Sequence, residues 1–111
     1  MEVFFESERL ATKLQSQKKM RKEFGPENAK WIVKRLDNLH FASNLEDMRL
    51  LPGRIHELTG DLKGVLAIDL KNGYRLLLEP AEDPPPCKDD GGLDWQAVRS
   101  IIITRVEDYH D

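Results

Sequence analysis

Apolar residues in the first forty positions follow the spacing of amphipathic helices, sparsely up to Phe24 and then at three- and four-residue steps from Ala29 to Leu39. A short strand over residues 2–6 is expected to precede them. Ser7 is the expected N-cap of a helix that ends at Phe24, and Pro26 suits the first turn of the helix that follows. The pattern therefore predicts a helical hairpin over residues 7–41 with one buried seam.

After residue 53 the apolar positions follow the period of strands. Strands are expected over residues 55–58, 65–70, 74–79 and 100–106, with turns at 61–64 and 71–73 and a short helical turn at 44–51. The last strand is apolar on both faces and is expected to lie inside the sheet. The order β-α-α-β-β-β-loop-β predicts one α+β domain over residues 1–111, with helices packed on one face of a small, mostly antiparallel sheet.

A three-residue loop at 71–73 would fix the register of the middle hairpin. Asp69 then faces Arg75, and Ile68 faces Leu76. One face carries Leu66, Ile68, Leu70, Tyr74, Leu76 and Leu78, and the other carries Val65, Ala67, Asp69, Arg75, Leu77 and Glu79. Gly73 is expected to take the left-handed conformation that such loops require.

Residues 80–96 interrupt the strands and are expected to form an exposed insertion. The runs Pro84-Pro85-Pro86 and Asp89-Asp90-Gly91-Gly92 do not suit a regular element. Cys87 lies inside this stretch and is the only cysteine, so no intrachain disulfide can form. It has no neighbouring histidine or base and is interpreted as a bystander.

Composition indicates an ordinary globular protein, with 40% hydrophobic and 33% charged residues. No apolar run reaches the length of a membrane span, and the acidic start lacks the features of a signal peptide. The expected location is therefore the cytoplasm, away from membranes.

Charge is unevenly distributed along the chain. The net charge of −3 argues against broad coating of nucleic acid. Residues 1–55 have 11 basic and 8 acidic side chains, whereas residues 56–111 have 6 and 12. The basic excess in the helices is either a solvated surface or a patch for RNA or the ribosome.

Histidine chemistry is the first functional signal. His40 ends the second helix and suits a capping role, His56 lies in the first strand after the helices, and His110 belongs to the terminal run Asp108-Tyr109-His110. Taken alone, a polar end this short is typical of a frayed terminus.

Three ordered motifs change that interpretation. The block at 52–79, PGRIHELTGDLKGVLAIDLKNGYRLLLE, contains a histidine after the helices, then GDLKG, then NGYR, and DYH follows at 108–110. In this order and spacing, the motifs resemble those of HigB-type toxins of the RelE/ParE superfamily, from type II toxin–antitoxin systems. The helical hairpin also agrees with that family, whereas residues 80–96 have no clear counterpart in it.

The resemblance implies a ribosome-dependent mRNA endonuclease that needs no metal or other cofactor. It also implies a co-encoded antitoxin, expected to be of the helix-turn-helix type, as a partner beside the ribosome and mRNA. The motif matches assign catalysis to His56, Arg75, Asp108, Tyr109 and His110, and RNA binding to Arg54 and Lys63.

RNA cleavage without a metal suits these residue types. The 2′-hydroxyl attacks the phosphorus after losing its proton, and the leaving 5′-oxygen gains one. Histidine can transfer either proton near neutral pH, an arginine can stabilise the phosphorane charge, and tyrosine can stack on a base. The hypothesis gives the base role to His110 or Asp108, the acid role to His56, charge stabilisation to Arg75 and positioning to Tyr109, with acid and base interchangeable.

Several alternatives stay open. The family often has arginine where this chain has Asp69, and pairing of Asp69 with Arg75 would either hold that arginine or partly neutralise it. A ParE-like gyrase inhibitor, or a decayed toxin retained as an antitoxin partner, would share the fold without cleaving RNA.

Other residues also have competing interpretations. His56, Asp108, His110 and Asp111 have donor groups that suit a metal. Trp31 and Trp95 are expected to anchor the core or loops rather than to stack on bases.

Overall fold

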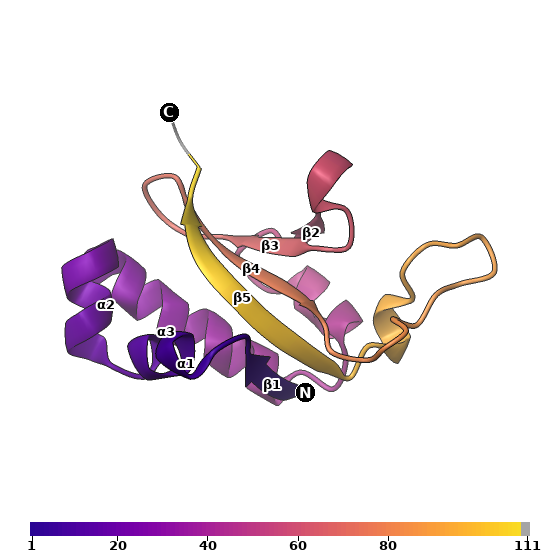
Figure 1. Ribbon diagram of the computed structural model, residues 1–111, viewed down its shortest axis with the longest axis horizontal. Coiled ribbons are helices and arrows are strands. Elements are labelled where there is room, and N and C mark those ends of the chain that lie inside the picture. Colours follow the sequence, from indigo (N-terminus) through magenta and orange to yellow (C-terminus); the bar gives the residue numbers. More distant parts are fainter. Residues whose placement is uncertain (110–111) are drawn as a thin grey trace.

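The computed structural model describes residues 1–109 and contains a five-stranded sheet (Figure 1). The strands are β1 (Glu2–Phe5), β2 (His56–Glu57), β3 (Leu66–Asp69), β4 (Tyr74–Pro80) and β5 (Ser100–Asp108). Their spatial order is β1-β5-β4-β3-β2, with β1 parallel to β5 and the other neighbours antiparallel. The expected α+β class and mostly antiparallel sheet are confirmed, and β5 lies inside the sheet as predicted.

Three helices replace the expected hairpin. They are α1 (Glu8–Leu14), α2 (Gln17–Phe24) and α3 (Pro26–Phe41). Ser7 caps α1 as expected, but the prediction of one helix up to Phe24 is wrong. The Ser16 hydroxyl accepts the backbone N–H of Lys19 at 3.2 Å and starts a new helix there.

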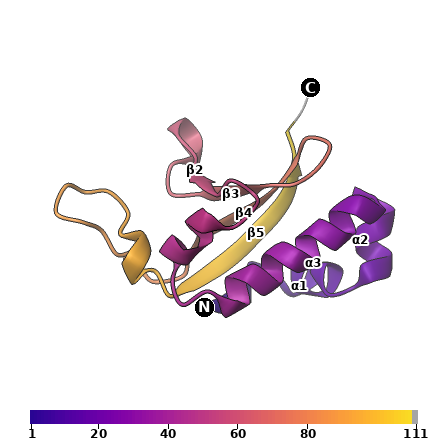
Figure 2. The same cartoon turned by 180° about the vertical axis from the view of Figure 1, so that it is seen from behind.

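The helices cover one face of the sheet (Figure 2). Buried side chains of α3, including Ile32 and Leu39, belong to the same cluster as the apolar face of the sheet. That face contributes Leu66, Ile68, Leu76, Leu78, Ile101 and Ile103. Successive residues of a strand point to opposite sides of the sheet, and the helices cover only one of these two sides.

The predicted register of the middle hairpin is confirmed. Leu66 pairs with Leu78, Ile68 with Leu76, and Asp69 with Arg75. Gly73 has the expected positive φ of 78°, and Asn72 before it also has a positive φ of 56°. Its turn lies next to the C-terminal end of β5 (Figure 1).

Three short 3₁₀ turns complete the described elements: η1 (Leu45–Leu50), η2 (Gly60–Leu62) and η3 (Trp95–Ala97). The turn η1 lies where residues 44–51 were expected to turn. Most of residues 81–94 are exposed, whereas Trp95 is 5% exposed and belongs to the core. The indole fills the end of the core while its N–H donates to Glu57 at 2.9 Å, which satisfies its polar atom.

The expected polar tail is largely part of the sheet. β5 continues to Asp108, and the backbone N–H of Tyr109 donates to the carbonyl of Gly73 at 3.0 Å. His110 and Asp111 lie outside the described residues. Within residues 1–109, no helix is both long and apolar enough to cross a membrane.

Candidate functional site

The sheet face turned away from the helices carries most of the candidate residues. We call the part of it around Arg75 the open face and define it by seven polar or aromatic side chains. These are Arg54, His56, Asp69, Arg75, Arg105, Glu107 and Tyr109. They include three arginines and two carboxylates, and Glu79 lies on the same side of β4.

Arg75 is fixed at the centre of the open face. Its Nε donates to Glu107 Oε2 at 2.6 Å, and the two side chains are only 17% and 19% exposed. The guanidinium carbon lies 4.4 Å from the centre of the Tyr109 ring, within the range of a cation–π contact. One predicted arginine and one predicted tyrosine are therefore brought together, and β4 and β5 hold them.

Glu107 is a residue that the sequence interpretation missed. Its second oxygen, Oε1, accepts from Arg105 Nη2 at 2.7 Å, so one carboxylate orients two guanidinium groups. The available signal was the alternation of Arg105 and Glu107 along β5. It could not be read as a pair with Arg75 until the partner of β5 was known.

Asp69 does not pair with Arg75, although the two are opposite each other in the register. Its Oδ2 instead accepts from Arg54 Nε at 2.7 Å. The two residues face each other as predicted, but the ion pair that this placement allowed does not form, because each side chain pairs with another residue of opposite charge. Arg54 has a positive φ of 47°, uncommon for a residue with a Cβ atom, at the edge of β3.

The ring of His56 is oriented by a hydrogen bond between Nδ1 and the backbone. Its Nδ1 lies 2.8 Å from the carbonyl oxygen of Arg54. A carbonyl can only accept, so Nδ1 carries a proton, and in the neutral ring Nε2 is the nitrogen that can accept one. The ring is thus oriented for proton transfer through Nε2.

The register relates His56 to Arg75 across the sheet. His56 pairs with Ala67, and Arg75 pairs with Asp69, two residues further along β3. With strands about 4.8 Å apart and a rise of about 3.4 Å per residue, their Cα atoms are roughly 12 Å apart. Two side chains of this length could contact one bound phosphate from either side.

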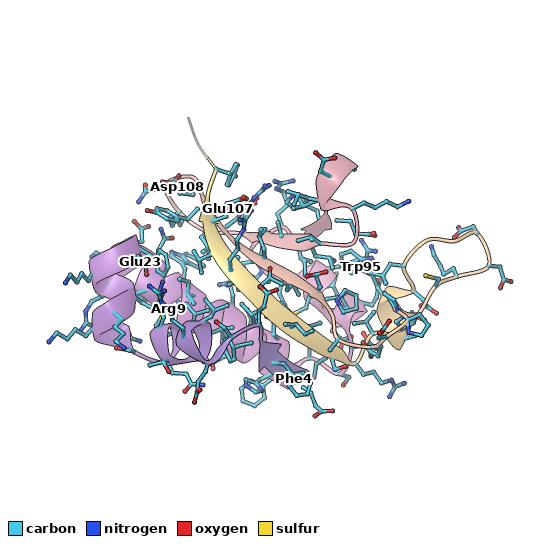
Figure 3. All side chains as sticks on the ribbon, in the orientation of Figure 1. Phe4, Arg9, Glu23, Trp95, Glu107 and Asp108 are labelled. Carbon is cyan, nitrogen blue, oxygen red and sulfur yellow. The ribbon has the colours of Figure 1, made fainter. Side chains whose placement is uncertain are left out.

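The remaining predicted residues are placed differently. Asp108 lies opposite Tyr74, so alternation puts it on the helix side, where Tyr74 meets the Phe24 ring edge-on at 5.7 Å. Figure 3 shows Glu107 and Asp108 together at the end of β5. Lys63 lines a separate pocket of about 200 Å³, which includes Cys87 in the insertion and no other predicted site residue.

The metal hypothesis is not tested by the described residues. Within residues 1–109, no group of three or more His, Cys, Asp or Glu side chains is placed to hold a metal ion. Two members of the proposed set, His110 and Asp111, lie outside that range.

Comparison with known proteins gives information about the fold. No family model and no curated protein matches the chain. A solved structure, a YoeB/ParE toxin from Agrobacterium tumefaciens, is similar over 99% of this chain and 100% of that chain, with a TM-score of 0.51 and 9% sequence identity. At this identity the likeness concerns the fold alone. The chain thus has the fold of a YoeB/ParE toxin, in agreement with the toxin-like α+β fold expected from its motifs.

Proposed function

We propose that the chain is the toxin of a type II toxin–antitoxin module and acts as a ribosome-dependent mRNA endonuclease of the HigB type. The main support is the geometry around Arg75, which is fixed under the Tyr109 ring on the same sheet face as His56. The shared toxin fold and the ordered GDLKG, NGYR and DYH motifs agree with it. The proposed partners are a co-encoded antitoxin, of the helix-turn-helix type, the ribosome and mRNA, in the cytoplasm.

The proposed reaction needs no metal. The 2′-oxygen gives up its proton to a base and attacks the adjacent phosphorus, and the bond from phosphorus to the 5′-oxygen breaks. The products are a 2′,3′-cyclic phosphate and a 5′-hydroxyl that has received a proton from an acid. We assign these proton transfers to His56, through Nε2, and to His110, with either order allowed.

Arg75 and Tyr109 are assigned to the phosphate and its neighbouring base. A fixed guanidinium can stabilise the charge that develops on the phosphorane oxygens without reorganising during the step. The tyrosine ring lies over that guanidinium and can stack on or position a nucleotide. We assign no part of this step to Asp108, because the register pairs it with Tyr74 on the helix side of the sheet.

One observation favours a second candidate, a non-catalytic binding protein of the same fold. Arg75 is paired with Glu107 and Arg54 with Asp69, so carboxylates offset part of the positive charge that a phosphate would need. A ParE-like gyrase inhibitor or a decayed toxin kept as an antitoxin partner would fit such a face. Expression that blocks DNA replication would favour the first, and expression without a growth defect would favour the second.

The proposed cleavage is tested with separate alanine variants of the two proposed proton-transfer groups. His56→Ala and His110→Ala are each expected to lower mRNA cleavage on translating ribosomes by about 100-fold or more, because each would remove a proton-transfer group. His40→Ala is the matched control, since His40 is exposed at the end of α3. Cleavage that is unchanged in both test variants would rule out the proposed mechanism.

A further inference from the structure

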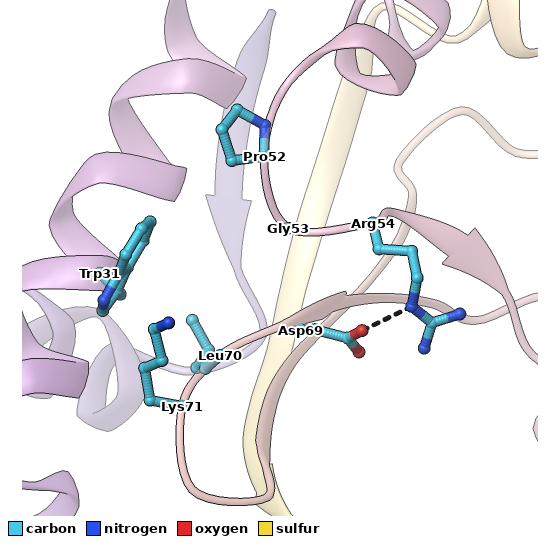
Figure 4. Close-up of a pocket in the computed structure, with 7 residues that line it drawn as sticks. All are labelled: Trp31, Pro52, Gly53, Arg54, Asp69, Leu70 and Lys71. Atoms are coloured by element: carbon cyan, nitrogen blue, oxygen red, sulfur yellow. Dashed lines mark hydrogen bonds and ion pairs between the residues drawn. The ribbon is translucent and has the colours of Figure 1, made fainter.

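A second pocket adjoins the open face at the edge of β3 (Figure 4). It has a volume of about 300 Å³ and is lined by Trp31, Pro52, Gly53, Arg54, Asp69, Leu70 and Lys71. Arg54 and Asp69 belong both to this pocket and to the open face. A strand of RNA leaving the open face over the β3 edge would therefore meet this pocket next.

Trp31 is the wall of the pocket contributed by α3. In Figure 4 the indole is seen nearly edge-on, with one broad face directed toward the other lining residues. Three cationic groups lie near its ring centre: Lys34 Nζ at 5.4 Å, Arg35 Cζ at 4.7 Å and Lys71 Nζ at 5.0 Å. An aromatic face surrounded by cations is the combination that proteins use for single-stranded nucleic acid.

Buried polar contacts fix both sides of the pocket. Arg35 is 3% exposed and donates through Nη1 to the carbonyl of Pro52 at 2.6 Å, which ties residue 52 to α3. Asn28 is 1% exposed and accepts the N–H of Lys71 at 2.8 Å while donating to its carbonyl at 3.0 Å. The pocket is therefore held by side chains of α3 and does not depend on loop contacts alone.

Two buried polar atoms beside the pocket have no hydrogen-bond partner among the described residues. They are Asp69 Oδ1 and Arg35 Nε, and Arg35 is only 3% exposed. Buried polar groups are nearly always satisfied, so each such atom calls for an explanation. Burial also lowers the pKa of the Arg35 guanidinium, because a buried charge loses its hydration.

We propose that this pocket binds one nucleotide of single-stranded RNA next to the nucleotide at the open face. The base packs against Trp31, and its phosphate lies between Arg54 and Lys71. The base can stack on Trp31 once Lys71 moves from the ring to the phosphate. Once Arg54 also turns to the phosphate, Asp69 can accept a hydrogen bond from the base or the ribose. This inference rests on the proposed function, because it assumes that RNA binds at the open face. It does not require that the RNA is cleaved there.

Trp31 was expected to anchor the core or loops, and of these two roles the core role does not describe its surroundings. Trp31 is only partly buried, whereas Trp95, for which the same role was expected, is 5% exposed and joins the core cluster. Trp31 is absent from that cluster, and cations surround it. A core anchor packs mainly among apolar side chains, whereas a base-binding platform gains from nearby cations.

The test measures binding separately from cleavage. A short, single-stranded 2′-O-methyl oligonucleotide lacks the attacking hydroxyl and therefore binds without being cut. With the full chain, Trp31→Ala is expected to raise its dissociation constant by at least about fivefold, because one stacked base is lost. Trp31→Phe should restore part of the affinity, and Lys71→Gln should weaken binding and reduce its dependence on salt.

Controls separate this inference from the proposed function. Circular dichroism of each variant checks the fold, and Trp31→Phe keeps an aromatic ring if Trp31→Ala folds poorly. The proposed nucleotide site would be overturned if Trp31→Phe and Lys71→Gln bind the oligonucleotide with unchanged affinity and Trp31→Ala either does the same or is unfolded. This holds even if the chain cleaves mRNA. If the Trp31 and Lys71 variants lose antitoxin binding but keep their affinity for the oligonucleotide, the proposed nucleotide site would also be overturned. Oligonucleotide binding that depends on Trp31 would support it even if no cleavage occurs.

Discussion

The two faces of the sheet use alternate residues of the same strands, yet one face is apolar and the other carries charged side chains. The helix side is a continuous apolar layer under α3, in which Leu76 and Ile68 are completely buried. The open face holds charged side chains that are paired in a row, such as Arg75 with Glu107 and Arg54 with Asp69. Stability therefore depends mainly on the first face, and the proposed chemistry on the second.

The contrast is sharpest between residues that are neighbours in sequence. Glu107 and Asp108 are both acidic and adjacent in β5, but the register pairs one with Arg75 and the other with Tyr74. A strand reverses its side-chain direction at every residue, so two similar side chains acquire unrelated surroundings. Their variants should differ for this reason.

The largest effect on stability is expected on the helix side. Leu76→Ala should lower the free energy of unfolding by about 2–5 kcal/mol, because it removes buried methyl groups and leaves a cavity. Chemical denaturation followed by circular dichroism measures this change. If Leu76→Ala is as stable as the unchanged chain, the helix side is not the main source of stability.

An intermediate effect is expected from the two acidic residues at the end of β5. Glu107→Gln should lower the rate of mRNA cleavage by about tenfold, because a neutral amide orients Arg75 and Arg105 less strongly than a carboxylate. Asp108→Asn serves as the matched control and should change the rate by less than about threefold, an effect too small for a transition-state contact. Single-turnover cleavage on ribosomes compares them, and equal losses in both variants would contradict the division between the faces.

The smallest effect is expected from the pair at the sheet edge. Asp69→Asn should change the free energy of unfolding by less than about 1 kcal/mol, because its partner Arg54 is 69% exposed and solvent screens the pair. Thermal and chemical denaturation would both detect a larger loss. A loss above that range would show that open-face ion pairs also stabilise the fold.

The middle hairpin could be predicted from the sequence because its determinants are local. A period-two apolar pattern and the turn at 71–73 together allow one register that buries the apolar set. Much of the open face, including the positions of Asp69 and Arg75, followed from that register. The partner of each charged side chain did not follow, because side chains near one another compete for the same ion pairs.

The pairing of β5 with β4 could not be derived in the same way. Nineteen residues separate Pro80 from Ser100, and no tight turn fixes the register. A shift between Leu77 and Leu78 also breaks the simple count along the strands. The contact of Glu107 with Arg75 depends on both features, which explains why the sequence did not indicate it.

The break between α1 and α2 was missed for a different reason. The apolar positions Leu14 and Met20 are six residues apart, and this gap was not interpreted as a helix end. Ser16 lies in the gap and caps a new helix by accepting the N–H of Lys19. Serine occurs both inside helices and at their starts, so its presence alone did not indicate the cap. The error does not change which face of the sheet is covered.

The proposed reaction on the open face is cleavage of mRNA by attack of the 2′-hydroxyl. It is tested by mapping the ends of mRNA from a purified translation reaction that contains the chain or its His56→Ala variant. We expect new 2′,3′-cyclic phosphate and 5′-hydroxyl ends at ribosome-bound codons, strongly reduced in the variant. Absence of such ends with the unchanged chain, or their equal abundance with His56→Ala, would contradict it.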